Sequence, residues 1–321
     1  MKRLRTAVVG VGYLGNFHAQ KHKALSELAE LSMELVAVCD QNETQAKKIA
    51  EALGVQAFTS PKDLIGKVDA VTIATITPAH FEVAKLFLQN GIHVNVEKPI
   101  ALTSVQAQEL VEIAEQKKIA LAVGHSERFG TIFQKWHAEI RNQNPRWVEF
   151  CRYAPFNKRG SDVSVLHDLM IHDLDLMLSL DTTKPQLLTA QAGSLITETH
   201  DWCTATFQFE SGLRTTVNVS RLGKEMTRQI RSADRQHLWL ANLQTGDLER
   251  TDVNKTDGTV SHVVTPMGRS DNLMLETENF IRHIQMGTPL LVTGRDGLRA
   301  LELVEVILSE IDSNIESKFG W

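Results

Sequence analysis

Three titratable side chains, Asp168, His172 and Asp175, stand at helical spacing in an otherwise apolar stretch. Positions i, i+4 and i+7 share one face of an α-helix, so the pattern predicts an imidazole flanked by two carboxylates. A carboxylate beside a histidine fixes its tautomer and stabilises the imidazolium, as a general base requires. The alternative is a structural histidine at a domain interface. We expect no metal site, because His167 and His172 lie about 140° apart around a helix.

Lys98 stands in the tripeptide Glu97-Lys98-Pro99, at the end of a predicted strand. Ligands of open parallel sheets bind outside the carboxyl ends of the strands, and proline restricts the residue before it to extended geometry. An ammonium held there can hydrogen-bond a hydroxyl and stabilise developing alkoxide charge. The alternative interpretation is a solvated charge at a strand end.

A glycine-rich loop follows the first predicted strand and opens a predicted helix, in the pattern G-x-G-x-x-G. In that context the first glycine makes a tight turn, the second lets the backbone approach a pyrophosphate, and the third lets helix and strand pack closely. Amide groups at the helix N-terminus then bind phosphate. The alternative is a glycine-rich turn without a ligand. We assign cofactor binding to Gly10, Gly12, Tyr13, Leu14 and Gly15.

Asp40 ends the second predicted strand, 25 residues after Gly15. An acidic residue about 20 positions past the glycine loop accepts hydrogen bonds from the adenosine ribose hydroxyls. The same carboxylate repels a 2′-phosphate, and no basic residue follows before Lys47. The sequence therefore predicts NAD rather than NADP, with a solvated loop aspartate as the alternative.

The elements that must position these residues alternate between strand and helix in residues 1–124. Near-continuous apolar strands separated by helices predict a doubly wound parallel sheet covered on both faces, which is a Rossmann domain. The predicted strands are 6–10, 34–40, 68–74, 92–96 and 119–123.

Residues 125–321 show a different pattern, with helical segments at 130–141 and 163–180 and then a run of strands. Such a run predicts an α+β domain built on a large, mostly antiparallel open sheet. In this arrangement the last predicted helix, about 294–313, can pack against the first domain. The predicted strands are 146–153, 187–197, 202–209, 213–220, 227–232 and 236–242.

The composition of the 321-residue chain excludes several classes of function. Lys and Arg total 34 against 39 Asp and Glu, giving a net charge of −5, and this lacks the basic field that nucleic acids require. No apolar run approaches the ~18 residues of a membrane helix, and we recognise no signal peptide. Three scattered cysteines fit a reducing cytoplasm. We therefore expect a cytoplasmic protein without nucleic-acid or membrane partners.

Taken together, these motifs resemble the Gfo/Idh/MocA family of oxidoreductases, over most of the chain. The resemblance implies that Lys98, Asp168 and His172 form the catalytic set, with His172 taking a hydroxyl proton, Lys98 steadying the oxygen and Asp168 orienting the site. It also implies that Thr75, His80 and Glu97 line the cofactor cleft.

A narrower resemblance points to a subgroup that includes UDP-N-acetylglucosamine 3-dehydrogenases. It is carried by Ser126–Phe129, Arg152–Phe156, Arg159-Gly160 and Leu169–Asp175, whereas His167 and Gly130 depart from the expected pattern. The implied substrate is a nucleotide sugar oxidised at C3. Guanidinium groups bind pyrophosphate well, so the candidate substrate residues are Arg128, Arg152, Arg159 and Asp175.

Two other functions stay open at this point. One is a free-sugar or polyol dehydrogenase of inositol type, and the other is a dinucleotide-binding sensor without turnover. We further expect a homodimer or homotetramer assembled on a face of the second sheet. Two features of the second sheet support this expectation: its strands carry large side chains, and few predicted helices are available to cover both faces. The large side chains are Trp202, Phe207, Phe209 and Trp239.

Overall fold

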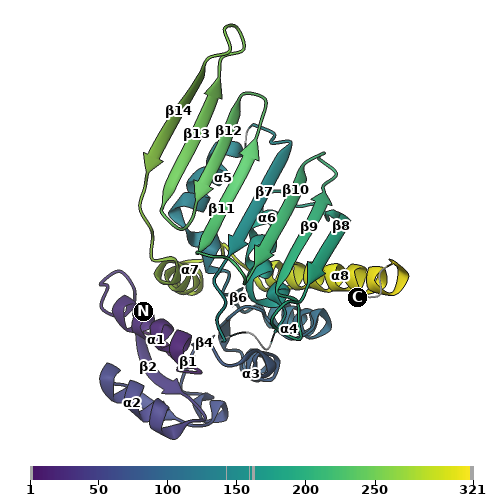
Figure 1. The fold of residues 1–321 in the computed structure, drawn as a ribbon. Coiled ribbons are helices and arrows are strands. Elements are labelled where there is room, and N and C mark those ends of the chain that lie inside the picture. The colour runs from purple at the N-terminus through teal and green to yellow at the C-terminus, as the bar shows by residue number, and fades with distance from the viewer. Residues whose placement is uncertain (1–2, 142, 159, 161–162, 319–321) are drawn as a thin grey trace. The chain divides into compact units, whose positions relative to one another are not determined.

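The computed structural model describes the backbone of residues 3–141, 143–158, 160 and 163–318 (Figure 1). The chain divides into two units, each with its own sheet. The first unit is Met1–Ser126 with Asp271–Leu298, and the second is Glu127–Ser270 with Arg299–Trp321. We expected one boundary, near 124/125. Instead, the segment Asp271–Leu298 returns to the first unit, and the chain after it belongs to the second unit.

The first unit contains a six-stranded parallel sheet in the order β3-β2-β1-β4-β5-β6. Its strands are β1 (Leu4–Val9), β2 (Met33–Cys39), β3 (Gln56–Phe58), β4 (Ala70–Ile73), β5 (His93–Val96) and β6 (Leu121–Val123). The helices between them are α1 (Tyr13–Leu25), α2 (Glu43–Leu53), α3 (Thr77–Gln89) and α4 (Ser104–Lys117). The order reverses between β1 and β4, which is the switch point where such sheets bind ligands. The predicted Rossmann sheet is confirmed.

Helix α7 (Asn272–Met286) belongs to this first unit although it follows the second sheet in sequence. It buries Phe280 and Ile281 in a cluster with Leu25 and Met33. The side chain of Asp271 caps the helix by accepting a hydrogen bond from the Met274 N–H. Nothing in the amphipathic pattern of α7 states which sheet it covers, so sequence reasoning placed it with the second domain.

The second unit contains an eight-stranded sheet in the order β14-β13-β12-β11-β7-β10-β9-β8. Its pairs are antiparallel except β7 with β10, which are parallel. The strands are β7 (Trp147–Tyr153), β8 (Gln186–Gly193), β9 (Trp202–Gln208), β10 (Arg214–Ser220), β11 (Thr227–Ala233), β12 (His237–Asn242), β13 (Asp247–Val253) and β14 (Val260–Pro266). This confirms the predicted open, mostly antiparallel sheet. Strands β13 and β14 extend it beyond the segments that the sequence indicated.

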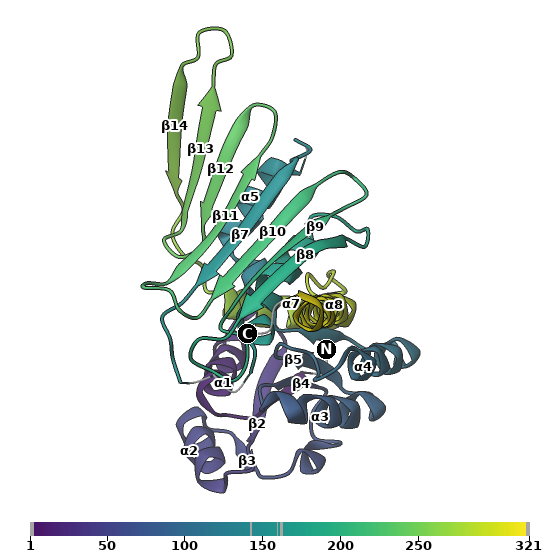
Figure 2. The same ribbon diagram turned by 45° about the vertical axis from the view of Figure 1, so that its right-hand side comes forward.

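Helices cover one face of this sheet, as Figure 1 and Figure 2 show for α5 (Thr131–Ile140) and α6 (Ile171–Leu178). Helix α8 (Gly294–Lys318) contributes Leu303 and Ile307 to the same core. Phe207, Phe209 and Trp239 are buried in that core. They are therefore not on an uncovered face, which corrects part of the reasoning behind the expected assembly.

The described helices include none that is both long and apolar enough to cross a membrane. Cys39, Cys151 and Cys203 are all buried as free thiols. Burial raises the pKa of the Cys39 and Cys203 thiols to about 12, so these two side chains are inert hydrophobic groups rather than nucleophiles.

Candidate active site

The glycine loop between β1 and α1 has the geometry that a bound dinucleotide needs. Gly10 has φ +82°, and a Cβ there would lie 2.7 Å from the backbone of Ala74 and Thr75. A Cβ on Gly15 would lie 1.7 Å from the Gly10 carbonyl oxygen, so helix and loop touch directly. A Cβ on Gly12 would meet nothing within 4 Å. The space beside Gly12 at the N-terminus of α1 thus fits a phosphate group.

Asp40 lies beside this loop. Its Oδ2 accepts a hydrogen bond of 2.8 Å from the Val11 N–H, and its Oδ1 accepts one of 2.9 Å from the Asn42 N–H. Gln45 on α2 adds a hydrogen bond from its side-chain amide to the Val11 carbonyl oxygen at 2.7 Å. Asp40 is therefore part of the loop's scaffold rather than a solvated loop residue. Each carboxylate oxygen keeps a second lone-pair site for a ribose hydroxyl.

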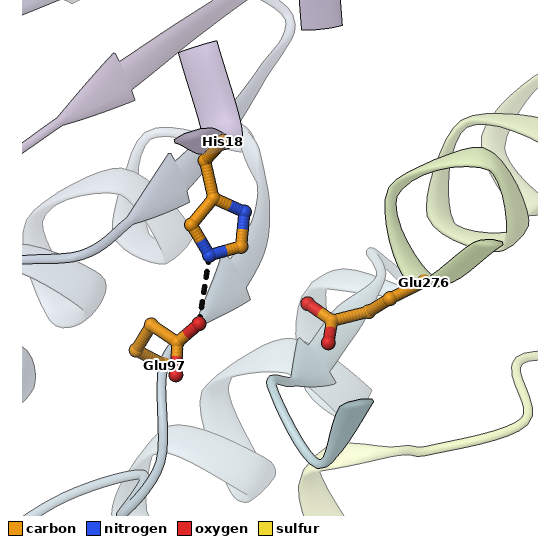
Figure 3. A group of neighbouring side chains, drawn as sticks. All are labelled: His18, Glu97 and Glu276. Carbon is orange, nitrogen blue, oxygen red and sulfur yellow. Dashed lines mark hydrogen bonds and ion pairs between the residues drawn. The ribbon is translucent and has the colours of Figure 1, made fainter. Parts of the chain in front are cut away.

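Lys98 follows the end of β5, where the parallel strands present their carboxyl ends. Its backbone N–H donates to Glu97 Oε2 at 3.2 Å, and Glu97 Oε1 lies 2.7 Å from Nε2 of His18 on α1 (Figure 3). Glu97 is buried, and a Cβ on Gly124 would lie 3.0 Å from its carboxyl carbon. His18, the Lys98 N–H and the backbone at Gly124 therefore fix the carboxylate of Glu97, and its hydrogen bond to the Lys98 N–H orients the backbone of Lys98.

His80 on α3 connects the same turn to the end of β4. Its Nδ1 lies 2.8 Å from the Pro99 carbonyl oxygen and its Nε2 lies 3.1 Å from the Thr75 carbonyl oxygen. Burial lowers the pKa of His80, so the neutral ring donates to only one of these two carbonyl oxygens. The buried ring therefore lies between Thr75 and Pro99 at the switch point of the sheet.

The two residues predicted for acid–base chemistry, Asp168 and His172, lie on the irregular turn before α6 and on α6 itself. Residues Leu166–Met170 form a π-helix, and α6 continues from Ile171. Asp168 lies in the π-turn, with its Oδ2 3.2 Å from where a Cβ of Gly160 would be. Asp168 and His172 are both half-buried. Single π-turns inside helices are frequent at functional sites because they redirect side chains.

Asp175 forms an ion pair that the sequence did not indicate. It is fully buried, and Arg128 donates to it through Nε at 2.9 Å and Nη2 at 2.8 Å. This bidentate ion pair ties the turn η2 (Ser126–Phe129) to α6. His172 and Asp175 keep helical spacing within α6, whereas the π-turn changes the rotation between Asp168 and these two residues. The imidazole between two carboxylates stays a prediction.

Arg152 is engaged in a similar way. It donates to Asp173 through Nε at 2.9 Å and Nη2 at 2.8 Å, and through Nη1 to Glu127 at 3.1 Å. Because Arg128 and Arg152 are buried and hold carboxylates, the geometry favours a role in fastening α6 over one in binding a phosphate. Their contact with the substrate stays a prediction. Arg159 lies outside the described residues.

Arg228 on β11 stands directly opposite Arg152 on β7 and shares Glu127 with it, at 3.1 Å from Nη1. Burial and the positive charges of Arg152 and Arg269 lower the pKa of Arg228. About a third of its side chain is exposed (32%). Like charges directly opposite one another destabilise a sheet, and the carboxylates of Glu127 and Asp173 oppose this repulsion at Arg228. The sequence analysis did not single out Arg228, because one arginine in a strand gives no signal.

A glycine loop of this geometry at the switch point of a parallel sheet defines a dinucleotide-binding protein. Residues 4–125 match the family model described as "Oxidoreductase family, NAD-binding Rossmann fold", and residues 123–232 match the "GFO/IDH/MocA C-terminal domain". The chain belongs to the Gfo/Idh/MocA family, as its motifs predicted.

Individual relatives span nearly the whole chain. UDP-N-acetylglucosamine 3-dehydrogenase of Acidithiobacillus ferrooxidans is 34% identical over 310 residues, which are 94% of this chain and 95% of that protein. A solved structure of that enzyme matches with a TM-score of 0.88 over 98% of this chain and 99% of that one. Myo-inositol 2-dehydrogenase of Thermotoga maritima is 24% identical over 94% of each chain. The dehydrogenase activity and the cofactor NAD follow from this family.

Proposed function

We propose that this protein oxidises a secondary hydroxyl of a nucleotide sugar at C3, with NAD as the hydride acceptor. The observation that carries the proposal is the 34% identity to UDP-N-acetylglucosamine 3-dehydrogenase along 94% of the chain. The retained set of Lys98, Asp168 and His172 supports it, because a protein that only senses a dinucleotide needs no base.

In this proposal each residue has one task. His172 removes the hydroxyl proton, Lys98 stabilises negative charge developing on the oxygen, and Asp168 orients the site. NAD, when bound, accepts the hydride from the same carbon. The loop of Gly10, Gly12, Tyr13, Leu14 and Gly15 would bind its diphosphate at the N-terminus of α1, where the open side of Gly12 leaves room for it. Thr75, His80 and Glu97 would line the cofactor cleft, and Asp40 would accept hydrogen bonds from its ribose.

The diphosphate of the substrate needs a cation that solvent and ligand can reach. We assign it to Arg228, which shares Glu127 with the buried Arg152 but has about a third of its side chain exposed. We favour Arg228 over Arg128 and Arg152, while Arg159 keeps its assignment as a proposal.

An NADH-formation assay with UDP-N-acetylglucosamine, UDP-glucose, myo-inositol and free glucosamine side by side tests the function. We expect turnover with the UDP-sugars. Turnover with myo-inositol alone would replace the proposal with a polyol dehydrogenase, for which the Thermotoga relative is the precedent. NAD binding without turnover of any of them would favour a sensor.

We further propose a cytoplasmic homodimer or homotetramer assembled on the face of the second sheet that lies opposite α5 and α6. By register, that face carries Trp147, Tyr153, Trp202, Leu238 and Leu240. An isologous contact between two such faces would bury these side chains. The three free thiols support a reducing compartment. Light scattering at micromolar concentration tests the assembly, and a monomer would contradict it.

A further inference from the structure

A buried cluster of three titratable side chains lies behind Glu97, within the first unit. His18 comes from α1, Glu97 follows β5, and Glu276 comes from α7. One ligand-type atom from each lies within 4.8 Å of the others, and Figure 3 shows the Glu276 carboxyl directed toward the His18–Glu97 pair. All three side chains are at least nine-tenths buried. The cofactor and substrate assignments use only Glu97 of the three.

The charges in this cluster cannot all be present together. Two ionised carboxylates this close inside a protein repel strongly, and in such pairs one of them keeps a proton. His18 selects which one. Burial opposes ionisation of both His18 and Glu97, yet their mutual hydrogen bond raises the pKa of His18 and lowers that of Glu97. Burial and the Glu97 charge raise the pKa of Glu276 to about 7.

The polar atoms around Glu276 agree with a neutral carboxyl. Asn95 donates from Nδ2 to Glu276 Oε1 at 3.0 Å, whereas Glu276 Oε2 has no partner among the described residues. Other titratable groups that interact with the cluster are His22 on α1, His80 on α3 and Lys98 beside Glu97. Burial, with the charge of His18, lowers the pKa of His22 to about 3, so His22 contributes no charge at neutral pH. Below pH about 7 the cluster is therefore a His18–Glu97 ion pair with a protonated Glu276.

We propose that His18 and Glu276 are positioning residues that act through Glu97 on Lys98. Glu97 binds His18 with one oxygen and the Lys98 N–H with the other, so its orientation sets the backbone that carries the proposed catalytic ammonium. A second negative charge on Glu276 displaces Glu97 from this arrangement and moves Lys98. The inference rests on the proposed role of Lys98 in the reaction.

A bound metal ion is the competing explanation of three such ligands. The 2.7 Å separation of His18 Nε2 and Glu97 Oε1 is that of a hydrogen bond, so these two atoms are satisfied by each other. We therefore assign a proton, and metal analysis of the purified protein is part of the test. A stoichiometric metal whose removal abolishes turnover, and which His18→Gln eliminates, would overturn the proposal.

The first experiment uses His22 as a matched control, because it lies one turn from His18, is equally buried, and contacts Thr6 and Thr72 instead of Glu97. His18→Leu should lower kcat at least about tenfold, while the Kd for NAD stays within about threefold. His18→Gln, which can still donate to Glu97, should recover part of that loss. His22→Leu should lower the melting temperature and leave kcat near the wild-type value. Equal kcat for the His18 and His22 variants would overturn the proposal.

The second experiment titrates the cluster. Above pH about 7, where Glu276 ionises, kcat of the wild type should fall, and Glu276→Gln should remove this falling limb while keeping activity at neutral pH.

The infrared carbonyl band of a protonated carboxyl gives a readout that needs no substrate. The band should be present at pH 6, disappear when the pH is raised, and be absent in Glu276→Gln. If the infrared band shows this pH dependence but Lys98→Ala is fully active, the proposed catalytic role of Lys98 is wrong, whereas the assignment of a proton to Glu276 is supported. A falling limb that persists in Glu276→Gln overturns the positioning role.

Discussion

The carboxylate of Asp40 accepts a hydrogen bond from the Val11 N–H at 2.8 Å, which joins the end of β2 to the glycine loop after β1. The residue that would read the cofactor ribose is therefore also one that shapes the phosphate loop. Substitutions at this position change both tasks unless they keep the acceptor. Asparagine removes the charge and keeps one of the two acceptor oxygens, so it can still accept from the Val11 N–H although the Asn42 N–H loses its partner. It therefore disturbs the loop less than alanine does.

We expect Asp40→Asn to narrow the preference for NAD over NADP by about tenfold, which corresponds to ~1.4 kcal/mol. The reason is the loss of like-charge repulsion with a 2′-phosphate. Asp40→Ala should weaken both cofactors further, because the Val11 N–H loses its partner. Titration of each variant with NAD and NADP by calorimetry gives the four constants. Wild-type protein that binds NADP as tightly as NAD would contradict the assignment.

The glycine loop provides a second prediction, about NAD binding, because Gly12 borders open space and Gly15 packs against backbone. A Cβ on Gly12 meets open space, whereas one on Gly15 would lie 1.7 Å from the Gly10 carbonyl oxygen. Gly12→Ala should therefore fold with a melting temperature near that of the wild type and bind NAD at least about tenfold more weakly. Gly15→Ala should lose about 1–3 kcal/mol or more of folding free energy through overpacking. The prediction fails if Gly12→Ala binds NAD normally.

The sequence was most informative where local patterns determine the structure. The glycine spacing, the apolar strands and the Lys98 tripeptide lie where they were expected, because turn geometry and burial act over a few residues. The pairing of Arg128 with Asp175 across 47 positions has no such pattern. The π-turn at Leu166–Met170 could not be read either, since its residues also suit an α-helix. Long-range partners and local helix irregularity are thus what the sequence leaves undetermined.

Two arginines of the second unit, Arg128 and Arg228, should differ in what their substitution changes, the first affecting stability and the second substrate binding. Arg128→Met leaves Asp175 buried without its partner, and we expect a loss of about 3–5 kcal/mol of folding free energy. Chemical denaturation measures this loss. An Arg128→Met protein of unchanged stability with a raised KM would support Arg128 as a substrate residue.

Arg228→Gln should instead raise the KM for a UDP-sugar by about tenfold or more and leave kcat within about threefold, because the lost contact is to the diphosphate rather than to the reacting carbon. Arg231→Gln is the matched control on the same strand, since Arg231 is half exposed and pairs with Glu149 on the opposite face. If both variants have the same KM, Arg228 does not bind the substrate.

Asp201 provides a prediction for acid stability. It is buried, and the N–H groups of Leu195, Ile196 and Thr197 donate to its Oδ2 at 2.6, 2.6 and 3.1 Å. Burial opposes its ionisation, yet these hydrogen bonds lower the pKa of Asp201 to about 2. A lowered folded-state pKa stabilises the fold above the unfolded-state value of 3.8 and loses that stabilisation as the pH falls toward 2. Asp201→Asn should thus be less stable than the wild type at pH 7 by about 2 kcal/mol, and the difference should shrink below pH 4. A difference that is independent of pH would assign the effect to packing.

The reaction itself gives the final prediction. If His172 is the base, its neutral form must be present, so kcat for oxidation should rise with pH through its apparent pKa. His172→Ala should lower kcat by roughly the 10²–10⁴ expected of a general base, with NAD binding nearly unchanged because the dinucleotide loop belongs to the other unit.

Lys98→Ala should also lower kcat, by removing charge stabilisation at the same oxygen. The double variant should lose less than the product of the two single effects, since groups that act on one atom are not independent. Single-turnover rates measured beside melting temperatures separate chemistry from folding. A His172→Ala enzyme that is well folded and within about threefold of the wild-type rate would remove His172 from the mechanism, because no general base is dispensable to that degree.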